Sequence, residues 1–123
     1  MYVRRHTVAV TTAADGSATA YTDTEVNGRV LMIQYVKTDF ADGVDFTITG
    51  AITGIGLWTD TNINAAETVC PRQPVHDQVG AALLYAAGGT AQTDAVYLAG
   101  ERVKIIIAAG GNAKSGTFYI TVG

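Results

Sequence analysis

Cysteine, histidine, proline and charge are all scarce in this sequence. Its 123 residues include one cysteine, two histidines and two prolines, and charged residues make up 15% of the chain. A single thiol, Cys70, excludes an internal disulfide and any metal site built from several cysteines. Low charge together with 48% hydrophobic residues argues against long disordered tails. The net charge of −3 lacks the basic surplus of a nucleic-acid-binding protein, so we expect no direct contact with nucleic acid.

Long apolar runs are also missing. No stretch approaches the roughly 20 residues that a membrane-spanning helix requires, and the start of the chain lacks the charged and then apolar pattern of a signal segment. We therefore expect no membrane partner and synthesis in the cytoplasm. A chain of 123 residues is long enough for one domain and too short for two. The prediction is a single domain over residues 1–123, with a short N-terminal arm over residues 1–5.

The residues that are abundant favour β-strands. Thr, Val, Ile and Tyr suit a pleated, half-buried surface, and 14 glycines supply turns. No stretch keeps the apolar spacing of a helix over three turns. The expected strands lie at 3–12, 18–23, 29–38, 44–49, 56–60, 95–99, 101–109 and 115–122. Between them, residues 61–78 are expected to form a long irregular connection.

Two apolar segments shape the expected architecture. Residues 80–87 (GAALLYAA) fit either a buried strand or two helical turns, and we favour the strand. Residues 29–38 are apolar on both faces, which predicts cover by a second sheet on one side and by a neighbouring chain on the other. One face is expected to hold Val30, Met32 and Val36, and the other Leu31, Ile33 and Tyr35. About eight short strands indicate an all-β, two-sheet antiparallel β-sandwich that is jelly-roll-like.

Two segments superficially offer catalytic chemistry. Cys70, His76 and Asp77 combine a nucleophile, a base and an acid, but they lie in one polar loop, whereas working triads join separate elements. We interpret Cys70 as an incidental loop cysteine. Residues 110–116 (GGNAKSG) do not meet the phosphate-loop pattern, and no helix follows to receive an anion. The prediction is that the chain is not an enzyme and needs no cofactor.

The acidic run DFADGVD is a candidate for metal binding. Asp39, Asp42 and Asp45 lack the alternate spacing and terminal glutamate of a calcium-binding loop, so we interpret the run as a solvated hairpin end. His6 and His76 cannot build a zinc site with one cysteine unless subunits share it. No metal site is expected.

Aromatic and basic side chains are the candidates for protein contact. Trp58 and Tyr85 could anchor an interface or stack on a sugar, although we favour a core position for Trp58. Arg4 and Arg5 could meet an acidic partner, but strand alternation lets at most one lie on any face. The candidate subunit or capsid contacts are Arg4, Arg5, Trp58, Arg72, His76, Tyr85, Asn112 and Lys114.

The segments GRVLMIQYVKTDFADGVDFTITG and LAGERVKIIIAAGGNAKSGTFYITVG carry a family resemblance. In strand pattern and turn residues the chain resembles the small head decoration, or cement, proteins of tailed bacteriophages. The resemblance implies a β-rich subunit, often a homotrimer, on the outer capsid surface of the virion and made in the host bacterial cytoplasm. There it would bridge major capsid protein subunits against the pressure of packaged DNA. No active-site residues come with this family.

Two other functions fit the same sequence. The chain could be another virion component, such as a tail, fibre or head-completion protein, on the same physical features. It could also be a carbohydrate-binding sandwich module, which requires Trp58 or tyrosines exposed on a concave face.

Overall fold

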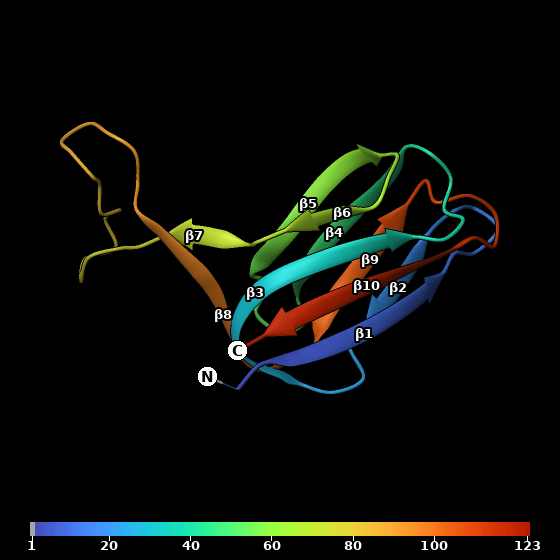
Figure 1. The fold of residues 1–123 in the computed structure, drawn as a ribbon, viewed down its shortest axis with the longest axis horizontal. Coiled ribbons are helices and arrows are strands. Elements are labelled where there is room, and N and C mark those ends of the chain that lie inside the picture. The colour runs from blue at the N-terminus through green and yellow to red at the C-terminus, as the bar shows by residue number, and fades with distance from the viewer. Residues whose placement is uncertain (1) are drawn as a thin grey trace.

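The computed structural model describes residues 2–123, and these fold into two antiparallel sheets (Figure 1). One sheet has six strands in the order β1-β10-β3-β8-β7, with β6 also paired to β3, and the other has the order β2-β9-β4-β5. The strands are β1 (Arg4–Thr11), β2 (Ala18–Tyr21), β3 (Val26–Lys37), β4 (Val44–Gly50), β5 (Gly56–Ile63), β6 (Glu67–Val69), β7 (Arg72–Pro74), β8 (Thr93–Glu101), β9 (Val103–Ala108) and β10 (Ser115–Val122). The predicted all-β sandwich is confirmed. Within residues 2–123 the structure has no helix that could cross a membrane.

The strand pairs are nested inside one another. β1 pairs with β10, β2 with β9, β3 with β8, and β4 with β5. This is one long hairpin rolled across two sheets, which is the strand order of a jelly roll. The eight framework strands match the number expected from the sequence, and β6 and β7 are short additions in the connection from β5 to β8.

The core lies between the sheets and is rich in aromatic rings. Alternate residues of β4 and β10 are buried, so each strand sends one side chain in two to the core. Tyr35, Phe46 and Phe118 meet there, with ring centroids 4.6 Å apart for Tyr35–Phe46 and 5.0 Å for Phe46–Phe118. Both contacts are edge-to-face, which is a preferred arrangement of aromatic pairs. Full burial of each phenylalanine side chain contributes about 1.5–3 kcal/mol.

The face assignment expected for residues 29–38 is wrong in part. Val30 is buried on the same side as Ile33 and Tyr35, because the register against β10 shifts between Thr121 and Val122. Such a bulge adds one residue and reverses the alternation beyond it. On the outer side Val36 is 41% exposed, so the single chain leaves this part of the outer face of β3 uncovered.

The connection from β5 to β8 differs most from the expectation. Residues 61–78 are not wholly irregular, because they hold the end of β5 and the strands β6 and β7. Residues 80–87 form no strand and no helix, and all of them are exposed. We call residues 75–92 the β7–β8 arm. Figure 1 shows this arm standing beyond the ends of β7 and β8, away from the two sheets.

The N-terminal residues belong to the sheet from Arg4 onward. Arg4 pairs with Val122 and Arg5 with Thr121, so these two residues of the expected N-terminal arm are part of β1. Tyr2 and Val3 precede the strand and are exposed. Met1 lies outside the described residues.

Candidate functional site

The structure places seven of the eight predicted contact residues in three separate regions and the eighth, Trp58, in the core. Arg4 and Arg5 begin β1, whereas Asn112 and Lys114 lie in the β9–β10 loop beside the opposite end of that strand. A third group, formed by Arg72, His76 and Tyr85, lies on β7 and the β7–β8 arm. The sequence expectation places Arg72 and His76 in the connection 61–78 and Tyr85 in a separate strand over 80–87, so it does not predict that these three residues share one element.

Trp58 is a core residue. Its side chain is 8% exposed, and its ring packs edge-on against Phe46 with centroids 5.5 Å apart. The core interpretation of Trp58 is confirmed, and the ring is not available as a stacking platform. A carbohydrate site would have to rely on tyrosines instead.

The two N-terminal arginines lie against different aromatic rings. The Arg5 guanidinium is 4.8 Å from the centroid of Tyr119, and the Arg4 guanidinium is 5.4 Å from that of Tyr2. Alternation along β1 separates the two side chains. Each contact contributes about 0.5–1 kcal/mol at an exposed site.

The cysteine-containing loop shows no catalytic arrangement. Cys70 and His76 are exposed. The Asp77 carboxylate accepts hydrogen bonds from the backbone N–H groups of Val79 and Ala81, at 2.9 and 3.0 Å, and so fixes a turn of the arm. Over residues 2–123, no hydrogen bond joins the side chains of Cys70, His76 and Asp77.

Each acid of the DFADGVD run has its own partner. Asp39 accepts the backbone N–H of Ser115, and Asp42 forms an ion pair with Lys37. Asp45 accepts the backbone N–H of Asn62 at 3.0 Å. The described part of the chain contains no group of three or more His, Cys, Asp or Glu side chains that could hold a metal ion.

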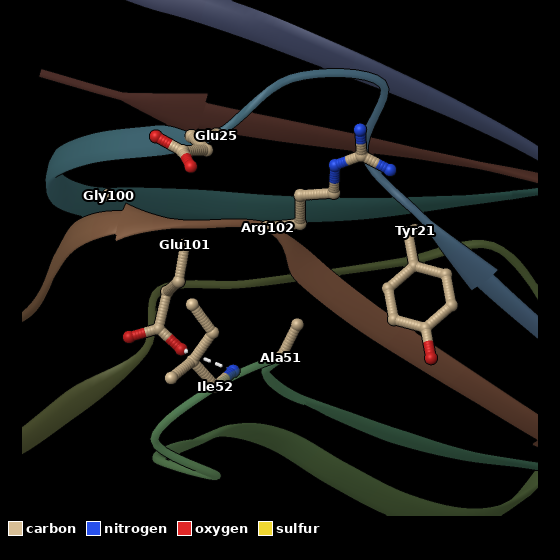
Figure 2. Close-up of a pocket in the computed structure, with 7 residues that line it drawn as sticks. All are labelled: Tyr21, Glu25, Ala51, Ile52, Gly100, Glu101 and Arg102. Carbon is tan, nitrogen blue, oxygen red and sulfur yellow. Dashed lines mark hydrogen bonds between the residues drawn. The ribbon is translucent and has the colours of Figure 1, made fainter.

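A hollow of about 270 Å³ lies where β2, the β4–β5 loop and the β8–β9 turn meet (Figure 2). Its lining residues are Tyr21, Glu25, Ala51, Ile52, Gly100, Glu101 and Arg102. In Figure 2 the Glu101 side chain turns toward the backbone of Ile52, and Arg102 points to the other side of its strand. Sequence reasoning missed this hollow, because its residues come from segments far apart in the chain.

The Glu101 side chain in that hollow binds the β4–β5 loop through hydrogen bonds. Its buried carboxylate accepts the backbone N–H groups of Ile52 and Thr53, both at 3.1 Å, and the Thr53 hydroxyl. These bonds, first of all that from the Thr53 N–H, hold the pKa of Glu101 below its usual range. The carboxylate therefore clamps the β4–β5 loop.

A second hollow, of about 250 Å³, lies at the base of the β7–β8 arm. The outgoing segment 73–76 and the returning segment 94–97 form its walls, and Tyr97 at its side is 56% exposed. Arg72 fixes the base, because its guanidinium donates to the hydroxyl and the carbonyl oxygen of Thr93, at 2.9 and 2.8 Å. We call this second hollow the base hollow.

The β7–β8 arm has a defined shape but no core. Val75 donates a backbone hydrogen bond to Gln92, Gln92 to Leu83, and Leu83 to Val75, each at 2.8 Å. These three bonds hold three segments of the arm in a closed ring. No residue from 72 to 94 is buried, and Val79 and Tyr85 are 81% and 75% exposed. The arm is thus an ordered apolar element that the single chain leaves uncovered.

No family model matches this chain, and a search of curated proteins finds no relative.

Proposed function

We propose that this chain is a non-enzymatic structural protein of a tailed-phage virion. It binds the outside of the capsid and stabilises the shell by bridging neighbouring major capsid protein subunits. The observation that carries the proposal is the β7–β8 arm, which keeps apolar side chains in water unless another protein covers them. An element of this kind is typical of a protein that works in an assembly. The resemblance of the sequence to phage head decoration proteins is the reason for proposing the phage capsid as that assembly.

The outer face of the six-stranded sheet is the surface that we assign to the capsid. The strand register places Thr7, Tyr119, Gln34 and Thr68 in one row across β1, β10, β3 and β6. The parallel row holds Ala9, Thr117 and Val36. Neither row contains a charged residue, and uncharged side chains lose water at a lower cost than charged ones.

The stabilisation follows from mass action. A protein that binds the assembled shell and not its free subunits lowers the free energy of the shell alone. Identical contacts repeated over a symmetric lattice add up, so each one can be weak.

The test uses the phage whose genome encodes this chain. Gold-labelled antibody against the chain should mark the outside of the heads of purified virions. Deletion of the gene should lower the temperature at which the heads release DNA, and purified protein added back should restore it. Absence of the chain from purified virions overturns the proposal. Label confined to tails or fibres would assign the chain to another virion component.

A further inference from the structure

The base hollow gathers side chains from both strands that carry the β7–β8 arm. The alternation of β8 is interrupted at Ala95 and Val96, which are both buried. Asp94 and Tyr97, on either side of them, are both exposed, and the Tyr97 hydroxyl lies 3.5 Å from the Asp94 carboxylate. Gln73 is the cross-strand partner of Asp94 and therefore shares its face. An aromatic ring, a carboxylate and an amide thus converge on the hollow.

The polar groups of the hollow retain capacity for hydrogen bonds. Asp94 Oδ1 accepts the backbone N–H of Ala95 at 2.7 Å, whereas the contact of Oδ2 with the Tyr97 hydroxyl is long for an O–H···O bond. An ionised carboxylate can accept about four hydrogen bonds in total, and the Gln73 amide both donates and accepts. The exposed His76 imidazole in the lining adds a further donor and acceptor.

The apolar part of the lining is suited to the C–H face of a sugar ring. Tyr97 is 56% exposed, so much of its ring is open to a ligand. Pro74, Val75 and Ala95 supply the apolar remainder of the lining. Tyrosine combines an apolar ring with a polar hydroxyl, so it can contact the C–H groups of a pyranose and one of its hydroxyls at once.

The polar groups favour a neutral sugar over an ion. Among the described residues no Lys or Arg lines the hollow, the nearby Arg72 is bound to Thr93, and Asp94 repels an anion. A cation only donates hydrogen bonds, which leaves the donor hydrogens of Gln73 without acceptors. Sugar hydroxyls donate and accept. The volume of about 250 Å³, below the roughly 300–1,000 Å³ of pockets for drug-sized ligands, suits a single ring.

We propose that the base hollow binds one neutral sugar ring of a glycan, with the Tyr97 ring against a face of the sugar and with Asp94 and Gln73 at its hydroxyls. The inference goes beyond the proposed function, because presence on a virion and sugar binding are measured separately and either can hold without the other. A capsid that carries many copies of such a site adheres to a glycan-coated surface through many weak contacts.

The experiment follows the backbone amide resonances of the isotope-labelled full chain during titration with the methyl glycosides of glucose, galactose, mannose and N-acetylglucosamine. For at least one of these sugars we expect shifts confined to the segments 73–76 and 94–97. The dissociation constant should be about 1 mM, as the small number of ligand atoms allows.

Substitutions in the hollow test the assigned contacts. Tyr97→Ala removes the ring and should raise the dissociation constant at least about tenfold, and Asp94→Asn, which keeps the size of the side chain, should raise it about tenfold. The matched control is Tyr85→Ala, which removes an exposed ring outside the hollow and should leave the dissociation constant unchanged. Emission from the buried Trp58 reports whether each variant is folded.

Four outcomes overturn the inference. They are no shift with any sugar at roughly fifty times the expected dissociation constant, binding that survives both Tyr97→Ala and Asp94→Asn, equal weakening by Tyr85→Ala, and the same shifts with glycerol. Titration with ethylammonium chloride tests the other class of ligand. If ethylammonium shifts the amides of the hollow and the sugars do not, the hollow takes a cationic side chain of another protein and the sugar proposal is wrong.

Discussion

Thr53 donates two kinds of hydrogen bond to Glu101: its backbone N–H reaches Oε1 at 3.1 Å, and its hydroxyl reaches Oε2 at 3.0 Å. The pair lies 48 positions apart in the sequence. It fixes the β4–β5 loop to the end of β8, where Glu101 is 4% exposed. Hydrogen bonds donated to both oxygens favour the ionised form of this carboxylate.

Glu101→Gln should destabilise the domain at neutral pH. The amide of glutamine replaces one acceptor oxygen with a donor group that would face the N–H and O–H donors of the loop. Because the folded-state pKa of Glu101 lies below its usual 4.5, the clamp contributes stability above that pH and loses it as the pH falls lower. Thermal unfolding of wild type and variant from pH 7 to pH 3 should therefore show a difference in melting temperature that becomes smaller as the pH falls.

The matched control for this clamp is Glu25→Gln, an exposed carboxylate at the same hollow. It should change the melting temperature little at any pH. A Glu101→Gln variant whose deficit stays constant down to pH 3 would contradict the assignment of the clamp to the ionised carboxylate.

Tyr35→Phe should stabilise the protein. The Tyr35 hydroxyl is buried and has no hydrogen-bond partner among the residues that the structure describes. An unsatisfied buried polar group costs roughly 1–3 kcal/mol, and phenylalanine removes the group while keeping the ring in the aromatic cluster. Urea unfolding at pH 7 should give a higher midpoint for the variant with an unchanged slope. Tyr85→Phe, at an exposed ring, is the control and should be neutral.

The same tyrosine should make the protein sensitive to alkali. Burial, and secondly the charge of Asp42, raises the pKa of Tyr35 from 10.0 to about 12. The unfolded chain then releases this proton before the folded chain does, so stability present below pH 10 is lost progressively up to about pH 12. Between pH 9 and pH 12 the free energy of unfolding should fall more steeply with pH for wild type than for Tyr35→Phe. Equal slopes would mean that Tyr35 ionises in the folded state as an ordinary tyrosine does.

Local periodicity predicted most of the framework, and the misses have physical causes. The strands at 44–49 and 115–122 were found because their side chains alternate strictly between core and solvent. The apolar run at 80–87 favours a buried strand because apolar residues are usually buried within their own chain, but nothing in this chain covers the run. The hydrogen bonds of Glu101 leave no local pattern in the sequence, since their donors lie 48 and 49 positions earlier in the chain.

Thr12→Val should loosen the end of the sandwich where the β1–β2 and β9–β10 loops meet. The Thr12 hydroxyl donates to the carbonyl oxygen of Gly111 at 2.6 Å and accepts the backbone N–H of Lys114 at 2.9 Å. Valine keeps the shape but leaves both backbone groups without this partner, at a cost of about 1–3 kcal/mol. Chemical denaturation should show this loss. Thr11→Val, at the exposed neighbouring residue, should stay within about 0.5 kcal/mol of wild type.

Gly116→Ala should destabilise the core through contact with one ring. A Cβ at Gly116 would overlap the Phe40 ring, which lies against the backbone of β10 at the edge of the aromatic cluster. Phe40 is 2% exposed and cannot swing into solvent without opening a cavity, so we expect a loss of about 1–3 kcal/mol, as in other overpacked cores. The control is Gly56→Ala, where an added Cβ meets no atom within 4 Å. If both alanine substitutions lowered the unfolding midpoint equally, the loss of stability would come from the backbone freedom of glycine, and contact with the Phe40 ring would not explain it. If only Gly116→Ala lowers the unfolding free energy, and lowers it less in a Phe40→Leu background, the loss comes from contact with the Phe40 ring.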